Sequence, residues 1–507
     1  MPIYLTTPIY YVNDKPHIGH AYTSLATDVL ARWHRLAGRE VYFLTGTDEH
    51  GQKVEKAATD AGEDPQAFTD RVSQAFRDLT VTMGFSNDAF IRTTEKRHYA
   101  ACQALWKRLQ ERGHIYLGAY EGWYAVRDEA FYGPDELIER DGVKYAPSGA
   151  PVEWVREPSY FFKLSEWGDK LLEFYEANPD FIAPQSRRNE VLSFVKSGLS
   201  DLSISRTSFK WGVPVPGDDA HVMYVWLDAL TNYITALGYP DEKSNLWRFW
   251  PADVHFVGKD ILRFHAIYWP AFLMAAGLQP PARVFAHGWW TNEGQKISKS
   301  LGNVIDPVAL VEEYGLDPIR YFLLREVPFG QDGDFSRTAL AHRLNGELAD
   351  VLGNLANRTL SLIQRNCEGK LPALPAIRDI DSTLIGPLDG LVESVAKLLE
   401  AQEYHLALEE VFRQVRGANG YITVQAPWAL KKTDPARMTE VLRHLHTALR
   451  AYATVLQPFM PTTMASLLDQ LGVPSDARGL ASLATPLPDG IDLPPPSPLF
   501  RKIEIAA

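Results

Sequence analysis

The chain of 507 residues contains little cysteine, since Cys102 and Cys367 are its only two. Two cysteines far apart in the sequence exclude a disulfide framework, and there is no Cys-x-x-Cys pair to form a zinc knuckle. We therefore expect no structural zinc and no metal site, and a site built from histidines alone is the remaining alternative.

Long apolar runs are also missing. No stretch approaches the roughly 20 apolar residues that span a bilayer, and the N-terminus lacks a basic region followed by an apolar signal core. Apolar residues make up 46% and charged residues 22% of the chain, which is ordinary for a globular protein. We expect a cytoplasmic protein of two to four domains, with no membrane partner.

Two further absences limit how the chain could bind nucleotides and nucleic acid. Neither G-x-G-x-x-G nor the Walker A pattern occurs, so any nucleotide phosphates must be bound by other loops. Basic residues are fewer than acidic ones, 51 against 63, and the formal net charge is −12. This argues against a general nucleic-acid coat, although a single RNA could still bind along a local basic stripe.

Strand and helix patterns alternate at the start of the chain. Residues 41–44 form a short apolar strand candidate, and helical periodicity follows over residues 64–83 and 95–112. Such alternation predicts a parallel sheet covered by helices. Aromatic residues, glycine and proline then become dense, the sheet pattern resumes near His221, and helical patterns dominate after Arg337, for example over residues 340–364, 388–417 and 438–456.

The fold class we expect is α/β, a parallel sheet split by a connective insert and followed by an α-helical bundle, and the family resemblance described below implies that this is a nucleotide-binding Rossmann-like sheet. The expected boundaries are 1–114 and 219–302 for the two catalytic halves and 115–218 for the insert. A linking segment, 303–337, follows the lysine-containing loop between Gly294 and Gly302. The helical domain is expected over 338–480, and residues 481–507 are expected to form a tail that packs back on the body.

The most informative motif is His17-Ile18-Gly19-His20, which lies between an apolar stretch and an amphipathic run. This order predicts a strand, a turn and a helix N-terminus, whose free N–H groups and partial positive charge suit a polyphosphate. His17 and His20 are three residues apart and share a helix face, and Gly19 leaves room for a flat base. Taken alone, the tetrad could equally be surface histidines near a helix cap.

A second motif, Lys296-Ile297-Ser298-Lys299-Ser300, lies between Gly294 and Gly302. Its composition favours a mobile loop whose two ammonium groups could hold a phosphate chain during attack at the α-phosphorus. A lone lysine pair is more often an ordinary basic loop. The two motifs together, in this order and about one catalytic domain apart, predict ATP bound for adenylyl transfer.

With these motifs, nearly the whole chain resembles the methionyl-tRNA synthetases, which are class I aminoacyl-tRNA synthetases. The resemblance also rests on the segments Thr6–Asn13, Thr45–Gly51, Tyr224–Ala229 and Gly258–Asp260. Many family members carry zinc-binding cysteines in the insert, where this chain has Ala125-Val126-Arg127-Asp128. The resemblance implies a methionine–tRNA ligase that serves initiator and elongator tRNA, with L-methionine, ATP carrying Mg²⁺ and tRNA(Met) as its partners.

The resemblance also assigns residues to the first reaction, in which the methionine carboxylate attacks ATP. No general base is needed, because this nucleophile is already anionic, and catalysis is then positioning and stabilisation of phosphate charge. The implied catalytic residues are His17, His20, Lys296 and Lys299. The implied ATP-binding residues are His17, Gly19, His20, Gly258, Asp260, Lys296, Ser298 and Lys299, with Asp260 at the ribose hydroxyls.

A methionine pocket must hold an unbranched thioether, and aromatic walls contact its sulfur favourably. The residues implied for this pocket are Ile9, Tyr11, Asp48, Trp226, Leu230, Tyr233, His265 and Trp269. Asp48 would receive the ammonium group, although it could also be a turn residue, and aromatic pairs at helical spacing are more often core residues. Some relatives have proline where Leu230 stands. Arg206 could close the pocket, assist the phosphates or form a surface salt bridge.

For tRNA, the resemblance places Asn354, Arg358 and Trp428 at the anticodon CAU, with Trp428 as a stacking surface. Without the resemblance, Asn354 and Arg358 could equally form a solvated helix face, and Trp428 could be a staple or a core residue. We expect a monomer, since no C-terminal dimerisation module is visible. Three alternatives are a Leu, Ile or Val synthetase, for which the insert looks too small, a nucleotide- or RNA-binding factor without aminoacylation, and a free-standing adenylyltransferase, which would leave the helical region unexplained.

Overall fold

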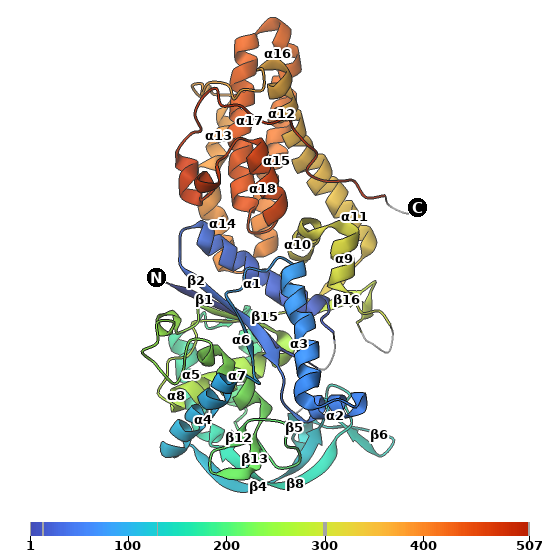
Figure 1. Cartoon of the computed structure of the whole chain (residues 1–507), viewed down its shortest axis with the longest axis vertical. Coiled ribbons are helices and arrows are strands. Elements are labelled where there is room, and N and C mark those ends of the chain that lie inside the picture. The colour runs from blue at the N-terminus through green and yellow to red at the C-terminus, as the bar shows by residue number, and fades with distance from the viewer. Residues whose placement is uncertain (1, 13–14, 129, 298–301, 505–507) are drawn as a thin grey trace. The chain divides into compact units, whose positions relative to one another are not determined.

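The computed structural model describes residues 2–12, 15–128, 130–297 and 302–504. The chain divides into two compact units, each made of several segments. The first unit contains Met1–Pro16, Val41–Val81 and Asn87–His287, and the second contains His17–Glu40, Thr82–Ser86 and Gly288–Ala507 (Figure 1). Two short segments from the first hundred residues therefore belong to the mostly C-terminal unit.

A six-stranded parallel sheet forms the centre of the first unit, and its strand order is β3-β2-β1-β14-β15-β9. The strands are short, apolar and largely buried, as expected for a parallel sheet with both faces covered. They are β1 (Ile3–Tyr11), β2 (Val41–Asp48), β3 (Ala89–Arg92), β9 (Ile182–Ala183), β14 (Val254–Gly258) and β15 (Val284–His287).

The helices of the first unit follow the predicted apolar periodicity. The helix predicted over residues 64–83 is α3 (Pro65–Thr82), and the helix predicted over residues 95–112 is α4 (Lys96–Glu111). The remaining helices are α2 (Gln52–Ala61), α5 (Gly168–Ala177), α6 (Gln185–Lys196), α7 (Val225–Thr235), a π-helix (Phe264–Tyr268) and α8 (Trp269–Ala275).

The segment expected as an insert, residues 115–218, differs in part from that expectation. Strands from this segment form an antiparallel sheet in the order β10 (Leu202–Ser203), β8 (Glu153–Phe162), β4 (Ile115–Ala125) and β5 (Ala130–Tyr132). A separate hairpin consists of β6 (Ile138–Arg140) and β7 (Val143–Tyr145). However, β9 pairs in parallel with β15 as an edge strand of the main sheet. Two paired residues are too short to give a sequence pattern, so this strand was not predicted.

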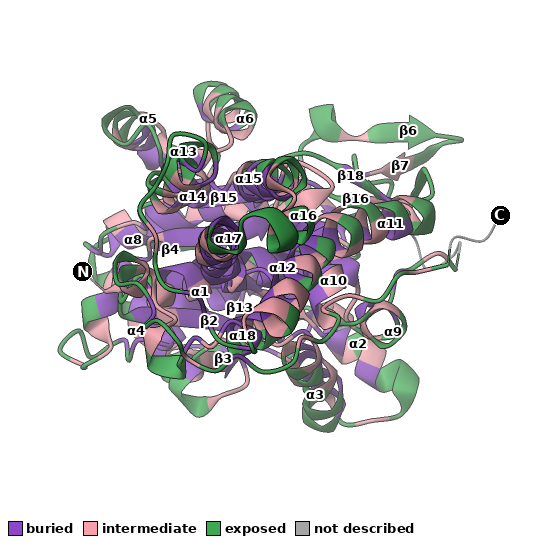
Figure 2. Cartoon of the chain, turned by 90° about the horizontal axis from the view of Figure 1, so that it is seen from above, coloured by how far each residue is buried: buried purple, intermediate pink, exposed green. Residues whose placement is uncertain are grey.

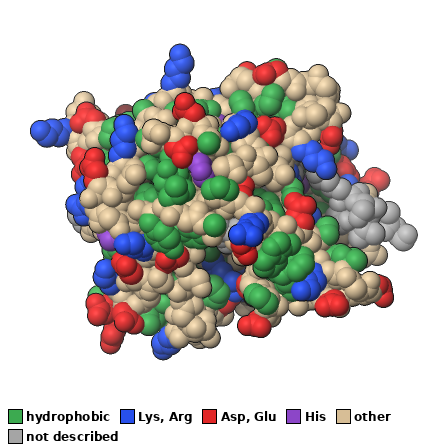
Figure 3. All heavy atoms as spheres, turned by 90° about the horizontal axis from the view of Figure 1, so that it is seen from below, with side chains coloured by type: hydrophobic (Ala, Val, Ile, Leu, Met, Phe, Trp, Pro, Cys, Tyr) green, Lys and Arg blue, Asp and Glu red, His purple; other side chains and the backbone are tan. Residues whose placement is uncertain are grey.

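The main sheet also resumes later than predicted. The strand near His221 is β13 (Asp218–Met223), which lies between β11 (Ser205–Arg206) and β12 (Pro214–Val215) in a small antiparallel sheet. The parallel sheet continues only at β14. One face of the first unit, shown in Figure 3, carries acidic and basic side chains interspersed with apolar ones. No helix among the described residues is both long and apolar enough to cross a bilayer.

The second unit is mainly helical, and α15 (Tyr404–Gln425) and α17 (Pro435–Leu456) are its longest helices. Buried residues extend along α17, which packs against α12, α15, α16 and α18 (Figure 2). The other helices are α1 (Ile18–Leu36), α9 (Pro307–Tyr314), α10 (Leu316–Arg325), α11 (Arg337–Arg343), a π-helix (Leu344–Gly353), α12 (Asn354–Asn366), α13 (Ser382–Ile385), α14 (Leu391–Glu400), α16 (Pro427–Thr433) and α18 (Pro461–Gln470).

The helical pattern over residues 388–417 is interrupted in the structure. Helix α14 ends at Glu400 and α15 starts at Tyr404. Between them Gln402 has φ of 58°, and its amide Nε2 donates to the carbonyls of Leu399 and Glu400. A left-handed residue that satisfies the last helical carbonyls ends a helix, as glycine does more often, and periodicity alone does not reveal it.

Near the end of the described chain, the tail contacts the helices. The side-chain amide of Asn345 donates to the carbonyl of Ile503 and accepts from its N–H, both at 2.8 Å. Lys502 forms an ion pair with Asp350 at 2.7 Å. Further back, Leu371 N–H donates to the carbonyl of Ile491. These contacts hold the proline-rich segment against the π-helix and the start of the helical bundle.

Candidate active site and anticodon-binding surface

In the first unit, candidate site residues gather where the parallel strands end. Tyr11 and Asp48 are register partners at the ends of β1 and β2, and Gly258 ends β14, the other neighbour of β1. In open parallel sheets, ligands bind at the carboxyl ends of the strands. Asp48 is 5% exposed, so its carboxylate is largely out of water, where charge-assisted bonds are strong.

A buried aromatic cluster adjoins this edge. The hydroxyl of Tyr233 on α7 lies 2.7 Å from Nε2 of His265, and Nδ1 of His265 lies 3.0 Å from the carbonyl of Ile261. A carbonyl only accepts, so Nδ1 carries the proton and Tyr233 donates to Nε2. Burial lowers the pKa of His265 to about 4. The imidazole is therefore neutral at physiological pH, and its tautomer is set by its two neighbours.

The other predicted pocket residues pack around the same core. Trp226 stacks on Phe264 with ring centroids 3.6 Å apart, and it meets His265 edge-on at 6.3 Å. Leu230 is 1% exposed, whereas Ile9 is only partly buried. His265 lies in the π-helix that leads into α8, whose first residue is Trp269. The predicted pocket residues are thus brought together, with Leu230, Tyr233 and Trp269 as core residues of the same cluster.

Gly258 and Asp260 lie at the turn after β14. A Cβ atom at Gly258 would lie 2.4 Å from Oδ1 of Asp260, so a larger residue would require this carboxylate to move. Asp260 is exposed.

Arg206 is 1% exposed, and its Nη1 donates to Ser203 Oγ and to the carbonyl of Ser205. The alternative that it forms a surface salt bridge is therefore wrong. Its guanidinium is buried, and its Nε lies 3.9 Å from Oε1 of Glu157, a carboxylate that is also buried.

The motif histidines belong to the second unit and form the N-terminal cap of α1. Nδ1 of His17 accepts from Gly19 N–H at 3.1 Å, and Nδ1 of His20 accepts from His17 N–H at 3.0 Å. A backbone N–H only donates, so neither Nδ1 carries a proton in these bonds, and each neutral ring carries its proton on Nε2. Burial and the neighbouring His17 lower the pKa of His20 well below its usual value. His20 thus presents a neutral Nε2–H donor.

This helix end lies beside both flanks of the lysine loop. Ile18 N–H donates to the carbonyl of Ile305 at 3.1 Å, and Tyr22 packs edge-on against Trp290 in β16 (Trp290–Asn292). Strand β17 (Gln295–Lys296) pairs with β16, and Asn303 donates to the carbonyl of Lys296 at 3.1 Å. Of the predicted loop residues, Lys296 is exposed, whereas Ser298 and Lys299 lie outside the described residues.

The sequence reasoning missed the buried His255. His255 on β14 accepts at Nε2 from the indole N–H of Trp269 at 3.3 Å, and its Nδ1 lies 2.7 Å from Thr6 Oγ1. It also stacks on Tyr233 at 4.0 Å. It therefore fixes two predicted pocket residues. A lone histidine in an apolar strand was its only sequence signal.

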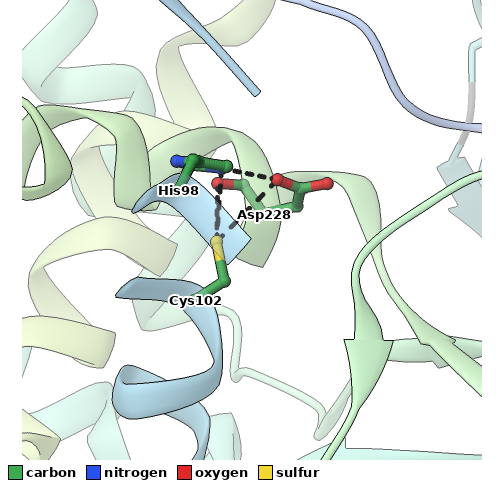
Figure 4. Close-up of side chains that lie close together, drawn as sticks. All are labelled: His98, Cys102 and Asp228. Atoms are coloured by element: carbon green, nitrogen blue, oxygen red, sulfur yellow. Dashed lines mark hydrogen bonds and ion pairs between the residues drawn. The ribbon is translucent and has the colours of Figure 1, made fainter. Parts of the chain in front are cut away.

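A second missed feature is the buried carboxylate of Asp228, bonded by His50 and His98, both at 2.7 Å. Figure 4 shows His98, Cys102 and Asp228 turned toward one another, and within the described parts of the chain this is the one cluster spaced for a metal. Two ligands of a tetrahedral metal would be about 3.3 Å apart, farther than the present His98–Asp228 contact. Burial and Asp228 also raise the pKa of Cys102 well above its usual value. The geometry is that of a hydrogen-bonded network joining α4 to α7.

The predicted anticodon residues lie together in the second unit. Asn354 and Arg358 are one helical turn apart on α12, and Asn354 is exposed. The guanidinium carbon of Arg358 lies 5.2 Å from the ring centroid of Trp428 on α16. Trp428 is 46% exposed, so it is not a core residue. A half-exposed indole next to a cation is a platform on which an unpaired base can stack.

Comparison with known proteins agrees with this geometry. The family model described as "tRNA synthetases class I (M)" matches residues 3–360, and "Anticodon binding domain of methionyl tRNA ligase" matches residues 371–506. The methionine–tRNA ligase of Brucella suis biovar 1 (strain 1330) is 57% identical over 501 residues, covering 98% of this chain and 97% of the relative. That of Rickettsia felis is 60% identical over 478 residues, covering 94% and 93%.

Solved structures give the same result. Mycobacterium tuberculosis methionyl-tRNA synthetase in complex with methionyl-adenylate superimposes with a TM-score of 0.97 at 51% identity, over 98% of this chain and 99% of that one. The free form of the Mycobacterium tuberculosis enzyme gives a TM-score of 0.91 at 47% identity, over 100% and 99%. By sequence and by fold, over nearly its whole length, this chain belongs to the class I methionyl-tRNA synthetases.

Proposed function

We propose that this chain is a methionine–tRNA ligase, which forms methionyl-adenylate and pyrophosphate from L-methionine and ATP and then transfers methionine to the 3′-terminal ribose of tRNA(Met). The observation that carries the proposal is the first turn of α1. There, two neutral imidazoles with Nε2–H donors lie beside both flanks of the lysine loop. Such donors suit the charge that develops on a triphosphate under attack.

In the first step, the methionine carboxylate attacks the α-phosphorus, a new P–O bond forms, and the bond to pyrophosphate breaks. His17 and His20 would donate to phosphate oxygens, and Lys296 and Lys299 would neutralise the leaving pyrophosphate. Gly258 and Asp260 would hold the ribose. Mg²⁺ would arrive as part of the ATP substrate.

For the amino acid, Asp48 would pair with the ammonium group while the aromatic cluster encloses the side chain. A thioether has no strong hydrogen-bonding group, so a histidine beside it is best neutral and already hydrogen-bonded within the protein. The neutral His265, satisfied by Tyr233 and the carbonyl of Ile261, meets this condition. Shape alone separates substrates by only about 1–3 kcal/mol per methylene.

Amino-acid-dependent ATP–pyrophosphate exchange tests the function, with each of the twenty amino acids supplied in turn. We expect L-methionine alone to support exchange, because the pocket has the chemistry of a thioether site. Exchange driven instead by leucine, isoleucine or valine would assign the chain to another class I activity, and no exchange with any amino acid would refute adenylate formation.

In the second step, a hydroxyl of the terminal tRNA ribose attacks the carbonyl of the adenylate and releases AMP; the class I fold favours the 2′-OH. Recognition of the CAU anticodon would fall to Asn354, Arg358 and Trp428. Edge hydrogen bonds from Asn354 and Arg358 would select the bases, and Trp428 would stack on one of them. We further propose that the protein acts as a monomer in the cytoplasm, which analytical ultracentrifugation and cell fractionation would check.

Replacing Trp428 by alanine should lower kcat/KM for tRNA charging by about 5- to 150-fold, since one base stack contributes about 1–3 kcal/mol. ATP–pyrophosphate exchange should be unchanged, because that reaction needs no anticodon. The matched control is Trp154→Ala, which removes another half-exposed tryptophan, from strand β8 of the other unit. Equal losses of charging and exchange in Trp428→Ala would show instead that Trp428 has a structural role.

A further inference from the structure

Helix α17 carries two buried arginines that have little compensating negative charge. Arg443 and Arg450 are 2% and 6% exposed and lie two helical turns apart. Within the described part of the chain, the only carboxylate paired with Arg443 is that of Asp489, at 3.7 Å and 55% exposed, and Arg450 has no carboxylate partner. Buried charges are normally paired, because taking an ion out of water is costly.

Backbone carbonyls satisfy the ends of both guanidinium groups. Arg443 donates to the carbonyls of Pro372 and Leu487, and Arg450 donates to those of Thr485 and Ser482, at 2.7 to 3.2 Å. These bonds hold the segment after α18 against α17. Among the described residues, however, the Nε–H of each arginine has no hydrogen-bond partner. These Nε atoms are themselves buried, but each guanidinium also has further N–H donors, and its positive charge has little compensation.

Both arginines line the same cavity of about 320 Å³, at the lower end of the range for ligand sites. Nine of the fourteen lining residues are apolar: Leu374, Ile385, Leu388, Val392, Ala451, Leu483, Ala484, Pro486 and Leu487. His446 also lines it, and Nε2 of His446 lies 2.9 Å from the carbonyl of Leu471. Burial lowers the pKa of His446 to about 4, so it adds no positive charge at neutral pH. The one acidic lining residue is Asp389, which is exposed.

We propose that this cavity binds a phosphomonoester with a small apolar body, its phosphate paired with Arg443 and Arg450 and its body packed against the leucine-rich wall. Two guanidinium groups match a dianion, and a phosphomonoester carries about −1.5 to −2 charges at neutral pH. A monocarboxylate would leave one arginine uncompensated. The apolar wall disfavours free inorganic phosphate, which has no surface to bury there.

Phenyl phosphate is the probe, titrated into the full-length protein by isothermal calorimetry at low salt, with inorganic phosphate and benzoate as comparisons. We expect saturable binding of phenyl phosphate, at least tenfold tighter than that of either comparison. The substitution Arg450→Met should weaken the binding of phenyl phosphate at least tenfold. The matched control is Arg416→Met, which removes a largely exposed arginine from α15 and should leave binding unchanged.

Because Arg450→Met also removes two backbone contacts, a second variant keeps the test decisive. Val392→Phe keeps both arginines and fills the cavity from α14, so it should also abolish binding while ATP–pyrophosphate exchange stays at the unsubstituted level. No saturable binding, equal affinity for benzoate, or binding that Val392→Phe leaves intact would each overturn the proposal.

Discussion

Replacing His20 by alanine should slow methionyl-adenylate formation by about 10²- to 10³-fold, which corresponds to roughly 3–4 kcal/mol of lost transition-state stabilisation. The expectation follows from the tautomer. Nδ1 of His20 accepts from the N–H of His17, so the proton of the neutral ring is on Nε2, the nitrogen that can donate to phosphate. The loss should fall on kcat, with little change in KM for methionine, because the contact strengthens as charge develops on the phosphates.

The control for this variant is His342→Ala, which removes an exposed histidine from α11 of the same unit. It should leave exchange unchanged. His20→Ala also removes half of the cap of α1, so its unfolding midpoint should be measured beside its rate. A normal exchange rate in a folded His20→Ala protein would rule out the phosphate role.

Replacing Asp381 by asparagine should destabilise the helical unit by about 3–5 kcal/mol. Asp381 is fully buried and accepts hydrogen bonds from Nη1 and Nη2 of Arg437 and from the hydroxyl of Tyr421. Arg437 is 6% exposed. An amide cannot neutralise this guanidinium, so the variant would leave it with only the partly exposed carboxylate of Glu440, at 3.1 Å, as an ionic partner. Asp379→Asn, at an exposed neighbouring carboxylate, should cost less than about 0.5 kcal/mol.

The same pair predicts a pH dependence of stability. Hydrogen bonds from Arg437 and Tyr421 outweigh burial and lower the pKa of Asp381 below its usual value. A lowered folded-state pKa means that the stabilisation is complete above the unfolded pKa of about 3.9 and is lost as the pH falls below it. Urea unfolding of the unsubstituted protein and of Asp381→Asn should be measured between pH 3 and pH 7. The difference in their free energies of unfolding should shrink toward the acidic end. A constant difference would exclude the ion pair as its source.

Periodicity predicted much of the fold, and the misses have local causes. The apolar faces of α3 and α4 were sufficient to place both helices within one residue of their ends. Strand β9 was missed because two residues carry no alternation, and the break at Gln402 depends on a side chain that takes the place of a glycine. The confirmed fold class thus follows from long elements, whereas short edges and helix ends depend on tertiary contacts.

The candidate site was predictable where motifs carry chemistry. Ordered spacing pointed to His17, His20 and the lysine loop, and the family resemblance supplied the pocket residues. The supporting residues could not be found in this way. His255 bonds to Thr6 and Asp228 bonds to His50, each more than a hundred positions away, and nothing in their own surroundings in the sequence indicates those partners. Such networks become visible only when strand and helix are placed side by side.

The reciprocal cap formed by His17 and His20 has a consequence for redesign and for natural variation. The two rings cap the start of a helix, and in the proposed mechanism their Nε2–H groups also donate to phosphate, so an amino acid suited to one role can fail in the other. Serine or aspartate would be a good N-cap residue, but its side chain contains no nitrogen that could donate to a phosphate. A library that randomises these two codons should therefore yield few active variants, even when it is screened at a low temperature at which destabilised variants still fold.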